Sequence, residues 1–165
     1  MNNRDRFYLR PAARVDADAI HQLRAVIFAK EFPEFPFDAA AEYDELVRIL
    51  TNPQSTSIWL ADLNNTIAGY IRTDSLGVGH NRMLAVTWFG VRADVRRRHY
   101  GTKLLNAAIG DMPAYAYAPR AVASSTGFYE NNGFTRIEND DDATDVAIDL
   151  LPTAPQPSAY SAFIR

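Results

Sequence analysis

The stretch WFGVRADVRRRHYGTKLL, residues 88–105, decides how the rest of the chain is interpreted. It begins at the end of MLAVTWFGV, residues 83–91, whose unbroken apolar pattern predicts a strand that is buried on both faces. In its second half, Leu104 and Leu105 start a set of apolar side chains at helical spacing, which predicts a helix over residues 100–110. A buried strand, a basic turn and a helix are therefore expected in succession.

The junction between the basic turn and the helix has the properties of an anion site. The N-terminus of a helix leaves about four backbone N–H groups unpaired, and the helix dipole is positive there. Arg96, Arg97 and Arg98 add full charges, and Gly101 lets the backbone approach a neighbour closely. This combination suits a phosphate group. A solvated basic turn between strand and helix is the alternative that composition alone leaves open.

Outward from this stretch, the chain alternates between strand and helix patterns. The predicted strands are residues 7–11, 57–62, 66–74, 83–91 and 114–118, and the predicted helices are 16–30 (capped by Asp16), 39–50, 100–110 and 121–131. Asn64-Asn65 predicts a hairpin turn, and residues 134–138 and 144–151 are expected to form a last hairpin. This order favours an α/β fold with a mixed, mostly antiparallel central sheet flanked by helices.

The domain organisation follows from length and proline content. At 165 residues the chain is expected to hold one domain, residues 1–151. Residues 152–165 are expected to be a proline-rich, extended tail. Its last apolar residues, Tyr160, Phe163 and Ile164, are expected to dock on the body or on a partner.

Composition excludes several classes of function. The chain has no cysteine and three scattered histidines, so we expect no disulfide, cysteine nucleophile or metal site. No apolar run reaches the roughly 18 residues of a membrane span, and the charged start MNNRDRFYLR lacks a signal-peptide core. We therefore expect a cytoplasmic protein without a membrane partner. The net charge of −3 and the shortness of the basic patch argue against nucleic acid as a partner.

Two blocks of the sequence resemble the GNAT N-acetyltransferase family. Arg96-Arg97-Arg98-His99-Tyr100-Gly101, followed by an apolar helix, resembles the acyl-CoA pyrophosphate signature of that family, which reads Arg or Gln, two residues, Gly, one residue, Gly or Ala. Phe128-Tyr129-Glu130-Asn131-Asn132-Gly133-Phe134 is similar to the family's Phe-Tyr-Glu-x-x-Gly-Phe segment. Together with the opening at residues 9–20, the resemblance covers most of residues 7–151 and implies a GNAT-type fold.

The resemblance implies an acyl-CoA-dependent N-acyltransferase. Such an enzyme moves the acetyl group of acetyl-CoA, its co-substrate, to a primary amine by direct attack in a ternary complex. The residues implied in cofactor binding are Phe89, Gly90, Val91, Arg96, Arg97, Arg98, His99, Tyr100, Gly101, Thr102, Ser125 and Phe128. Tyr129 is implied as the catalytic acid, since a phenol with a pKa of about 10 can protonate a thiolate whose conjugate acid has a pKa of about 8.5. A core aromatic residue is the alternative for Tyr129.

Two positions depart from the family pattern. His99 replaces the first glycine, and a left-handed backbone there would cost about 1 kcal/mol or more. Ala85 stands where many members carry a glutamate base, so water or another residue must deprotonate the acceptor amine. His80, Asp94 and Glu130 are the candidates that the sequence offers.

The acceptor side is expected in the loop of residues 31–38, which alternates acids, phenylalanines and prolines. Glu34, Phe35 and Phe37 are the predicted substrate-binding residues, because acids beside aromatic faces suit a cationic amine. The alternative is that the phenylalanines fill the core and the acids are solvated. The acceptor can be a small molecule or a protein amine, and a homodimer is left open. The competing hypothesis for the whole chain is a weak or inactive GNAT-fold module that acts through protein–protein binding.

Overall fold

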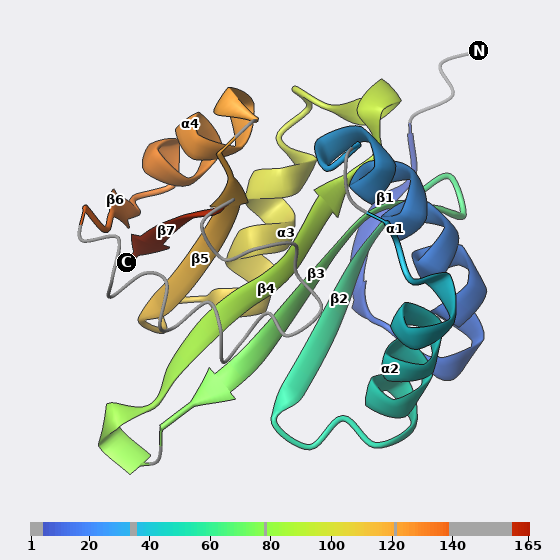
Figure 1. The fold of residues 1–165 in the computed structure, drawn as a ribbon, viewed down its shortest axis with the longest axis horizontal. Coiled ribbons are helices and arrows are strands. Elements are labelled where there is room, and N and C mark those ends of the chain that lie inside the picture. The colour runs from blue at the N-terminus through green and yellow to red at the C-terminus, as the bar shows by residue number, and fades with distance from the viewer. Residues whose placement is uncertain (1–4, 34–35, 78, 121, 139–159) are drawn as a thin grey trace.

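A mixed sheet forms the centre of the structure, a computed structural model that describes residues 5–33, 36–77, 79–120, 122–138 and 160–165. Its strands are β1 (Phe7–Pro11), β2 (Thr56–Leu63), β3 (Thr66–Leu76), β4 (Met83–Val91), β5 (Ala114–Pro119), β6 (Thr135–Arg136) and β7 (Tyr160–Ile164). The helices are α1 (Ala17–Glu31), α2 (Ala39–Thr51), α3 (Tyr100–Ile109) and α4 (Ala123–Asn131). The strand order is β1-β2-β3-β4-β5-β7-β6 (Figure 1).

The pairing confirms the predicted fold class. Strands β1 to β4 form an antiparallel meander, and β7 pairs antiparallel with both β5 and β6. Only β4 and β5 are parallel among these pairs, and α3 connects them as the crossover helix. The predicted turn at Asn64-Asn65 has positive φ at both residues, 54° and 64°, as a two-residue hairpin requires.

The start of α1 differs from the prediction. Asp16 occupies the N-cap position, but its side chain makes no capping hydrogen bond to α1. The carboxylate instead accepts a hydrogen bond from the Ala13 backbone N–H at 2.7 Å and forms an ion pair with Arg10 at 2.7 Å. The Arg10 guanidinium lowers the pKa of Asp16. The Asp16 carboxylate therefore binds Arg10 and Ala13 instead of capping α1. Asp38, by contrast, caps α2 by accepting from the Ala41 N–H at 3.0 Å.

The C-terminal residues form a strand of the sheet. Strand β7 lies between β5 and β6, and Phe163 is fully buried there. Residues 144–151, the predicted partner of 134–138, lie outside the described residues, and the partner that the structure gives to β6 is β7. Docking of the last aromatic residues on the body, one of the two expected outcomes, is what the structure shows.

The helices cover both faces of the sheet. Helices α1 and α2 pack on one face, around a core cluster that includes Ile20, Leu46 and Trp88. Helices α3 and α4 pack on the other face, where Leu105 and Tyr129 belong to a second cluster. Figure 1 shows this arrangement.

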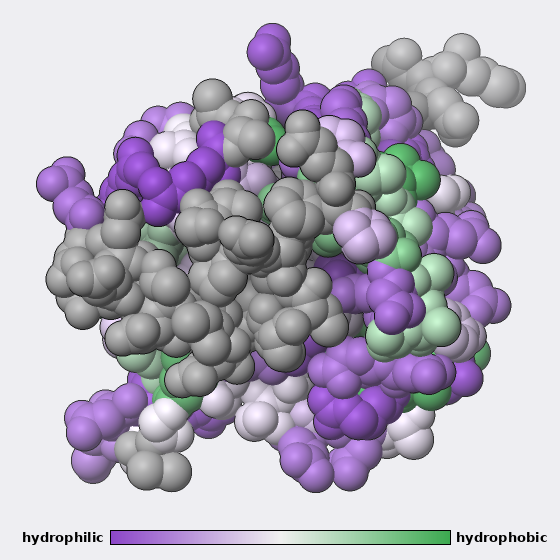
Figure 2. Space-filling view, in the orientation of Figure 1, coloured by the Kyte–Doolittle hydropathy of each residue, from purple (hydrophilic) through white to green (hydrophobic). Residues whose placement is uncertain are grey.

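The exposed large apolar side chains of the described surface are scattered over separate elements. They are Tyr8, Val15, Val26 and Ile164. Hydrophilic residues dominate the described surface that is visible in Figure 2. Within the described residues, no helix combines the length and the apolar character that crossing a membrane requires.

Strands β4 and β5 separate after a short stretch of pairing. They pair over three positions, from Leu84 with Ala114 to Val86 with Ala116. On the other side of β4 the register with β3 then shifts at Thr87, so this residue forms a bulge. The bulge is held by the Thr87 hydroxyl, which donates to Asp74 Oδ2 at 2.6 Å. Beyond it, β4 remains paired with β3 as far as Val91, while its edge toward β5 is free.

The loop between β4 and α3 contains two residues in the left-handed region. Arg97 has φ 64°, and His99, the N-cap residue of α3, has φ 60° and ψ 13°. A residue with a Cβ atom pays about 1–2 kcal/mol for this conformation. His99, which replaces the first glycine of the family signature, therefore has a left-handed backbone in this chain.

We predict that His99→Gly stabilises the protein. The His99 side chain is exposed, so little packing is lost. Relief of the backbone strain is partly offset by the greater freedom of glycine in the unfolded chain, and we expect a gain of about 0.5–1 kcal/mol in the free energy of unfolding. Urea denaturation measures it. His99→Ala is the matched control, because alanine keeps the strain; equal stability of the two variants would contradict the prediction.

Candidate functional site

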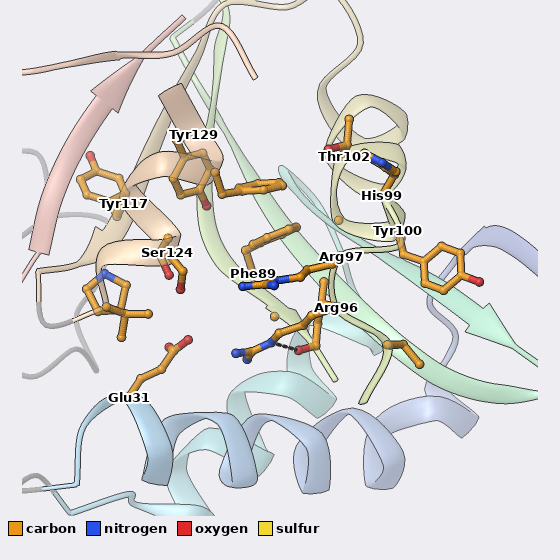
Figure 3. Close-up of a pocket in the computed structure, with 18 residues that line it drawn as sticks. Glu31, Phe89, Arg96, Arg97, His99, Tyr100, Thr102, Tyr117, Ser124 and Tyr129 are labelled. Atoms are coloured by element: carbon orange, nitrogen blue, oxygen red, sulfur yellow. Dashed lines mark hydrogen bonds between the residues drawn. The ribbon is translucent and has the colours of Figure 1, made fainter. Parts of the chain in front are cut away.

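A cavity of about 470 Å³ lies where β4 and β5 separate, and Figure 3 shows its lining. Its walls come from the free end of β4, the following loop, the first turn of α3, the end of β5 and helix α4, and from the last residue of α1. Because α1 covers one face of the sheet and α3 and α4 cover the other, the cavity is lined from both faces. The bulge at Thr87 is thus what opens the sheet at this point.

The structure brings most of the predicted site residues to this cavity. Those that line it are Phe89, Gly90, Val91, Arg96, Arg97, His99, Tyr100, Gly101, Thr102, Ser125, Phe128 and Tyr129. The two sequence blocks, which are separate along the chain, therefore meet at one site.

Other predicted residues lie elsewhere. Arg98 is turned away and forms an ion pair with Asp5 at 3.0 Å. Phe37 is half-buried with its ring centre 5.2 Å from that of Phe28, and it does not line the cavity. Its ring also lies 5.7 Å from that of His21. Glu34 and Phe35 lie outside the described residues.

Sequence reasoning missed six lining residues: Glu31, Val95, Tyr117, Pro119, Val122 and Ser124. Glu31 stood at the edge of the predicted acceptor loop, but its sequence context did not set it apart from the other acids. Tyr117 lies in the predicted strand 114–118 and Pro119 just beyond it, at the end of β5, where this strand is no longer paired with β4. Nothing in a single sequence marks that separation.

The part of the cavity at the start of α3 is cationic. Helix α3 begins there with its unpaired N–H groups, and Arg96, Arg97 and His99 line the same region. Arg96 Nε donates to the Val91 carbonyl oxygen at 3.0 Å, which ties the loop to the end of β4. At Gly101, a Cβ atom would lie 3.2 Å from Phe89 Cζ and 3.3 Å from Phe128 Cε2. The absence of a side chain at Gly101 therefore brings α3 close to these two rings.

Tyr129 is almost completely buried but reaches the cavity. It is 2% exposed, and its ring centre lies 5.4 Å from those of Phe128, Phe134 and Phe163. Burial raises the pKa of its phenol above the usual value, and the negative charge of Glu31 adds to this rise. The hydroxyl group is therefore protonated at neutral pH and can act as a proton donor.

Glu31 enters the cavity from the opposite face of the sheet. It is the last residue of α1, and in Figure 3 its carboxylate points into the cavity. Burial raises the pKa of this carboxyl group, while the positive charges of Arg96, Arg24 and Lys30 oppose the rise. Within the described lining of the cavity, Glu31 is the one carboxylate.

Close packing of α1 on β4 fixes the position of Glu31. Gly90 makes this approach possible, because a Cβ atom there would lie 2.6 Å from both Ile27 Cδ1 and Tyr70 Oη. Arg24, also on α1, forms an ion pair with Glu42, and its Cζ atom lies 3.5 Å from the centre of the Trp88 ring. A cation on an aromatic face contributes about 1–2 kcal/mol when it is largely desolvated.

The bases suggested by the sequence do not line the cavity. His80, Asp94 and Glu130 are exposed, and Asp94 is paired with Arg92 at 2.7 Å. Ala85, at the position of the family glutamate, is fully buried. In the described part of the chain, no group of three or more His, Cys, Asp or Glu side chains is arranged to hold a metal ion.

Comparison with solved structures shows the same fold. An N-acetyltransferase named PaiA from Thermoplasma acidophilum, in complex with coenzyme A, has 12% identity and a TM-score of 0.73, over 97% of this chain and 98% of the other. A GNAT-family acetyltransferase from Staphylococcus aureus Mu50 has 21% identity and a TM-score of 0.72 over the same shares. A protein described as a predicted acetyltransferase with acetyl-CoA, from Clostridium acetobutylicum, has 16% identity and a TM-score of 0.66, over 81% and 93% of the two chains.

Sequence comparison gives the family. No curated protein sequence matches the chain significantly. The sequence model of the Acetyltransferase (GNAT) family matches residues 17–134, which run from the start of α1 to the end of the second predicted block. This match covers more than half of the chain and includes all of β4, the basic loop and α3. The chain therefore belongs to the GNAT acetyltransferase family.

Proposed function

We propose that the protein is an N-acetyltransferase that uses acetyl-CoA as co-substrate and a primary amine as acceptor. One observation carries the proposal: the free edge of β4, the N-terminus of α3 and Tyr129 of α4 line a single cavity. A chain that had kept the fold as a binding module alone would have no need for this combination.

The cavity fits the parts of acetyl-CoA. The backbone N–H groups at the start of α3, with Arg96, Arg97 and His99, suit the pyrophosphate. The end of β4, from Phe89 to Val91, is paired with β3 on one side only, so its edge toward β5 offers backbone hydrogen-bonding groups for the amides of the pantetheine arm. The solved relatives from T. acidophilum and C. acetobutylicum, which contain coenzyme A and acetyl-CoA, support this assignment.

The proposed reaction is direct transfer. The chain has no cysteine to form a thioester acyl-enzyme, so the amine nitrogen attacks the thioester carbonyl carbon itself. The carbon–sulfur bond then breaks, and Tyr129 donates its phenolic proton to the departing thiolate. The new amide nitrogen returns a proton to Tyr129. Positioning of the two substrates in one cavity supplies the remaining rate enhancement.

Acetyl-CoA binding is the first test. Ligand at about 100 times its Kd adds roughly 2.7 kcal/mol to stability, which corresponds to about 5–10 °C in Tm for a chain of this size. Arg97→Gln is expected to raise the Kd about tenfold, since it removes a charged donor from the cavity. Arg98→Gln is the matched control, because Arg98 faces Asp5 instead, and its Kd should equal that of the wild type. Isothermal titration calorimetry measures both.

The amine requirement is tested with acetyl-CoA and a panel of phenethylamine, spermidine, glucosamine and a peptide with a free N-terminus. Release of the free thiol of CoA that depends on the amine, with an acetylated product in the mass spectrum, is the expected result. Binding of acetyl-CoA without transfer to any of these amines would count against the enzyme and in favour of the binding module.

Tyr129→Phe is predicted to lower kcat by about 100-fold, the scale of a general acid. The phenyl ring keeps the contacts with Phe128, Phe134 and Phe163, so the fold and the affinity for acetyl-CoA should be retained. Steady-state kinetics at saturating acetyl-CoA, with calorimetry of the same variant, provide the measurement. An unchanged kcat would leave Tyr129 as a core residue only.

A further inference from the structure

We propose that Glu31 binds the ammonium group of the acceptor and then removes its proton, so that it is the general base of the reaction. This inference rests on the proposed acetyl transfer and adds a catalytic residue to it. No family motif quoted above includes Glu31.

The first argument is the distribution of charge in the cavity. Among the described lining residues, the charged side chains other than Glu31 are the cations Arg96 and Arg97, at the α3 end. In Figure 3 the Glu31 carboxylate points into the cavity from α1, with Ser124 and Tyr129 on the far side. The arginines of the loop before α3 attract an anionic cofactor, and the Glu31 carboxylate attracts a cationic acceptor, while the charge of Arg96 acts on Glu31 as well.

The second argument is the freedom of the carboxylate. The residues whose charge or titration bears on Glu31 are Arg24, Lys30, Tyr70, Arg96, Tyr129 and Tyr160. The two arginines whose charge acts on Glu31 each have another partner: Arg24 pairs with Glu42, and Arg96 donates to the Val91 carbonyl oxygen. In the part of the chain that the structure describes, Glu31 forms no ion pair of its own. Its oxygens are thus available to a ligand.

The third argument is basicity. A carboxylate in water has a pKa of about 4.3 and is a weak base at neutral pH. Burial raises the pKa of Glu31, and this brings it closer to the pH at which a general base is effective. The three tyrosines that face it remain neutral, since burial raises the pKa of Tyr70 to about 12 and also raises those of Tyr129 and Tyr160.

The surroundings also define the class of acceptor. Tyr117 and Tyr129 line the cavity, and the charge of Glu31 acts on the phenol of Tyr129. Aromatic faces attract a cation and pack against an apolar group. The acceptor is therefore a primary alkyl ammonium that carries an apolar or aromatic group.

The proton balance of the step is simple. The ammonium nitrogen gives one proton to a Glu31 oxygen, which leaves a neutral amine and a neutral carboxylic acid. The nitrogen lone pair then forms the bond to the thioester carbon, and the electrons of the carbon–sulfur bond leave with the sulfur. Glu31 returns its proton to water after the products leave, which restores the carboxylate.

The test compares Glu31→Gln with the wild type over a range of pH. We expect the wild type to acetylate phenethylamine faster than spermidine or glucosamine, and the opposite preference would contradict the proposed class of acceptor. The comparison uses whichever of the three the wild type acetylates fastest. At pH 7 we expect kcat/KM for the amine to fall by about 100-fold, because glutamine neither attracts nor deprotonates an ammonium. The kcat/KM of the variant should rise as the pH approaches the pKa of the amine, because a growing fraction of the amine is then already neutral in solution. At pH 9.5 we expect less than a tenfold difference from the wild type.

A binding measurement gives a second readout that does not depend on turnover. The same amine is titrated by calorimetry into protein saturated with CoA, which carries no acetyl group. Glu31→Gln should weaken amine binding at least tenfold and leave the Kd of acetyl-CoA unchanged. Glu130→Gln is the matched control, because Glu130 is exposed and does not line the cavity, and it should behave as the wild type in every assay.

The outcomes separate the two proposals. An active wild type with a Glu31→Gln variant that is equally active at pH 7, or that loses the same factor at every pH, would overturn the role of Glu31 as base and leave the acetyltransferase intact. A wild type that acetylates neither the three amines nor the peptide with a free N-terminus would overturn both proposals, and acetyl-CoA calorimetry would then show whether the cofactor site survives.

Discussion

The separation of β4 from β5 is the constraint on which the site depends. The Thr87 bulge, held by Asp74, ends the parallel pairing after Val86 and leaves the last residues of β4 without a partner on that side. An unpaired backbone inside a sheet carries unsatisfied hydrogen-bonding groups, which is costly unless water or a ligand pairs with them. The pairing between β4 and β5 is thus absent where the backbone of β4 lines the cavity.

The two faces of the sheet contribute different chemistry to this opening. Helix α3 brings its positive end and the basic loop, while α1 brings a carboxylate. The position of α1 depends on close contacts with β4, namely Gly90 against Ile27 and Arg24 on the Trp88 ring. These packing contacts between α1 and β4 therefore set the position of the Glu31 carboxylate in the cavity.

The sequence predicted what local pattern can specify. The apolar run of β4, the helical spacing of α3 and the Asn64-Asn65 turn are properties of neighbouring residues, and the structure confirms these elements. The left-handed backbone at His99 could also be anticipated, because the resemblance placed a glycine there. Most residues that are predicted to bind the cofactor lie in one continuous stretch, so they could also be predicted from the local sequence.

The remaining features depend on contacts between distant segments. Glu31 and Tyr117 reach the cavity only through the packing of α1 and the divergence of β5, which no periodicity records. The alternation of apolar residues in β7 does not indicate that this strand lies between β5 and β6 in the sheet. Asp16 had the sequence position of a helix cap, but its carboxylate binds Arg10 and the Ala13 backbone N–H, two local partners that helical periodicity does not reveal.

The unequal charge of the two ends of the cavity also bears on how a catalytic cycle would end. Acetylation converts an ammonium into a neutral amide, so the attraction to Glu31 disappears with the reaction. CoA keeps its phosphates, and with them its attraction to Arg96, Arg97 and the start of α3. In the proposed reaction the acetylated product is therefore expected to leave first, and CoA, which competes with acetyl-CoA for the same cations, is expected to be the stronger product inhibitor.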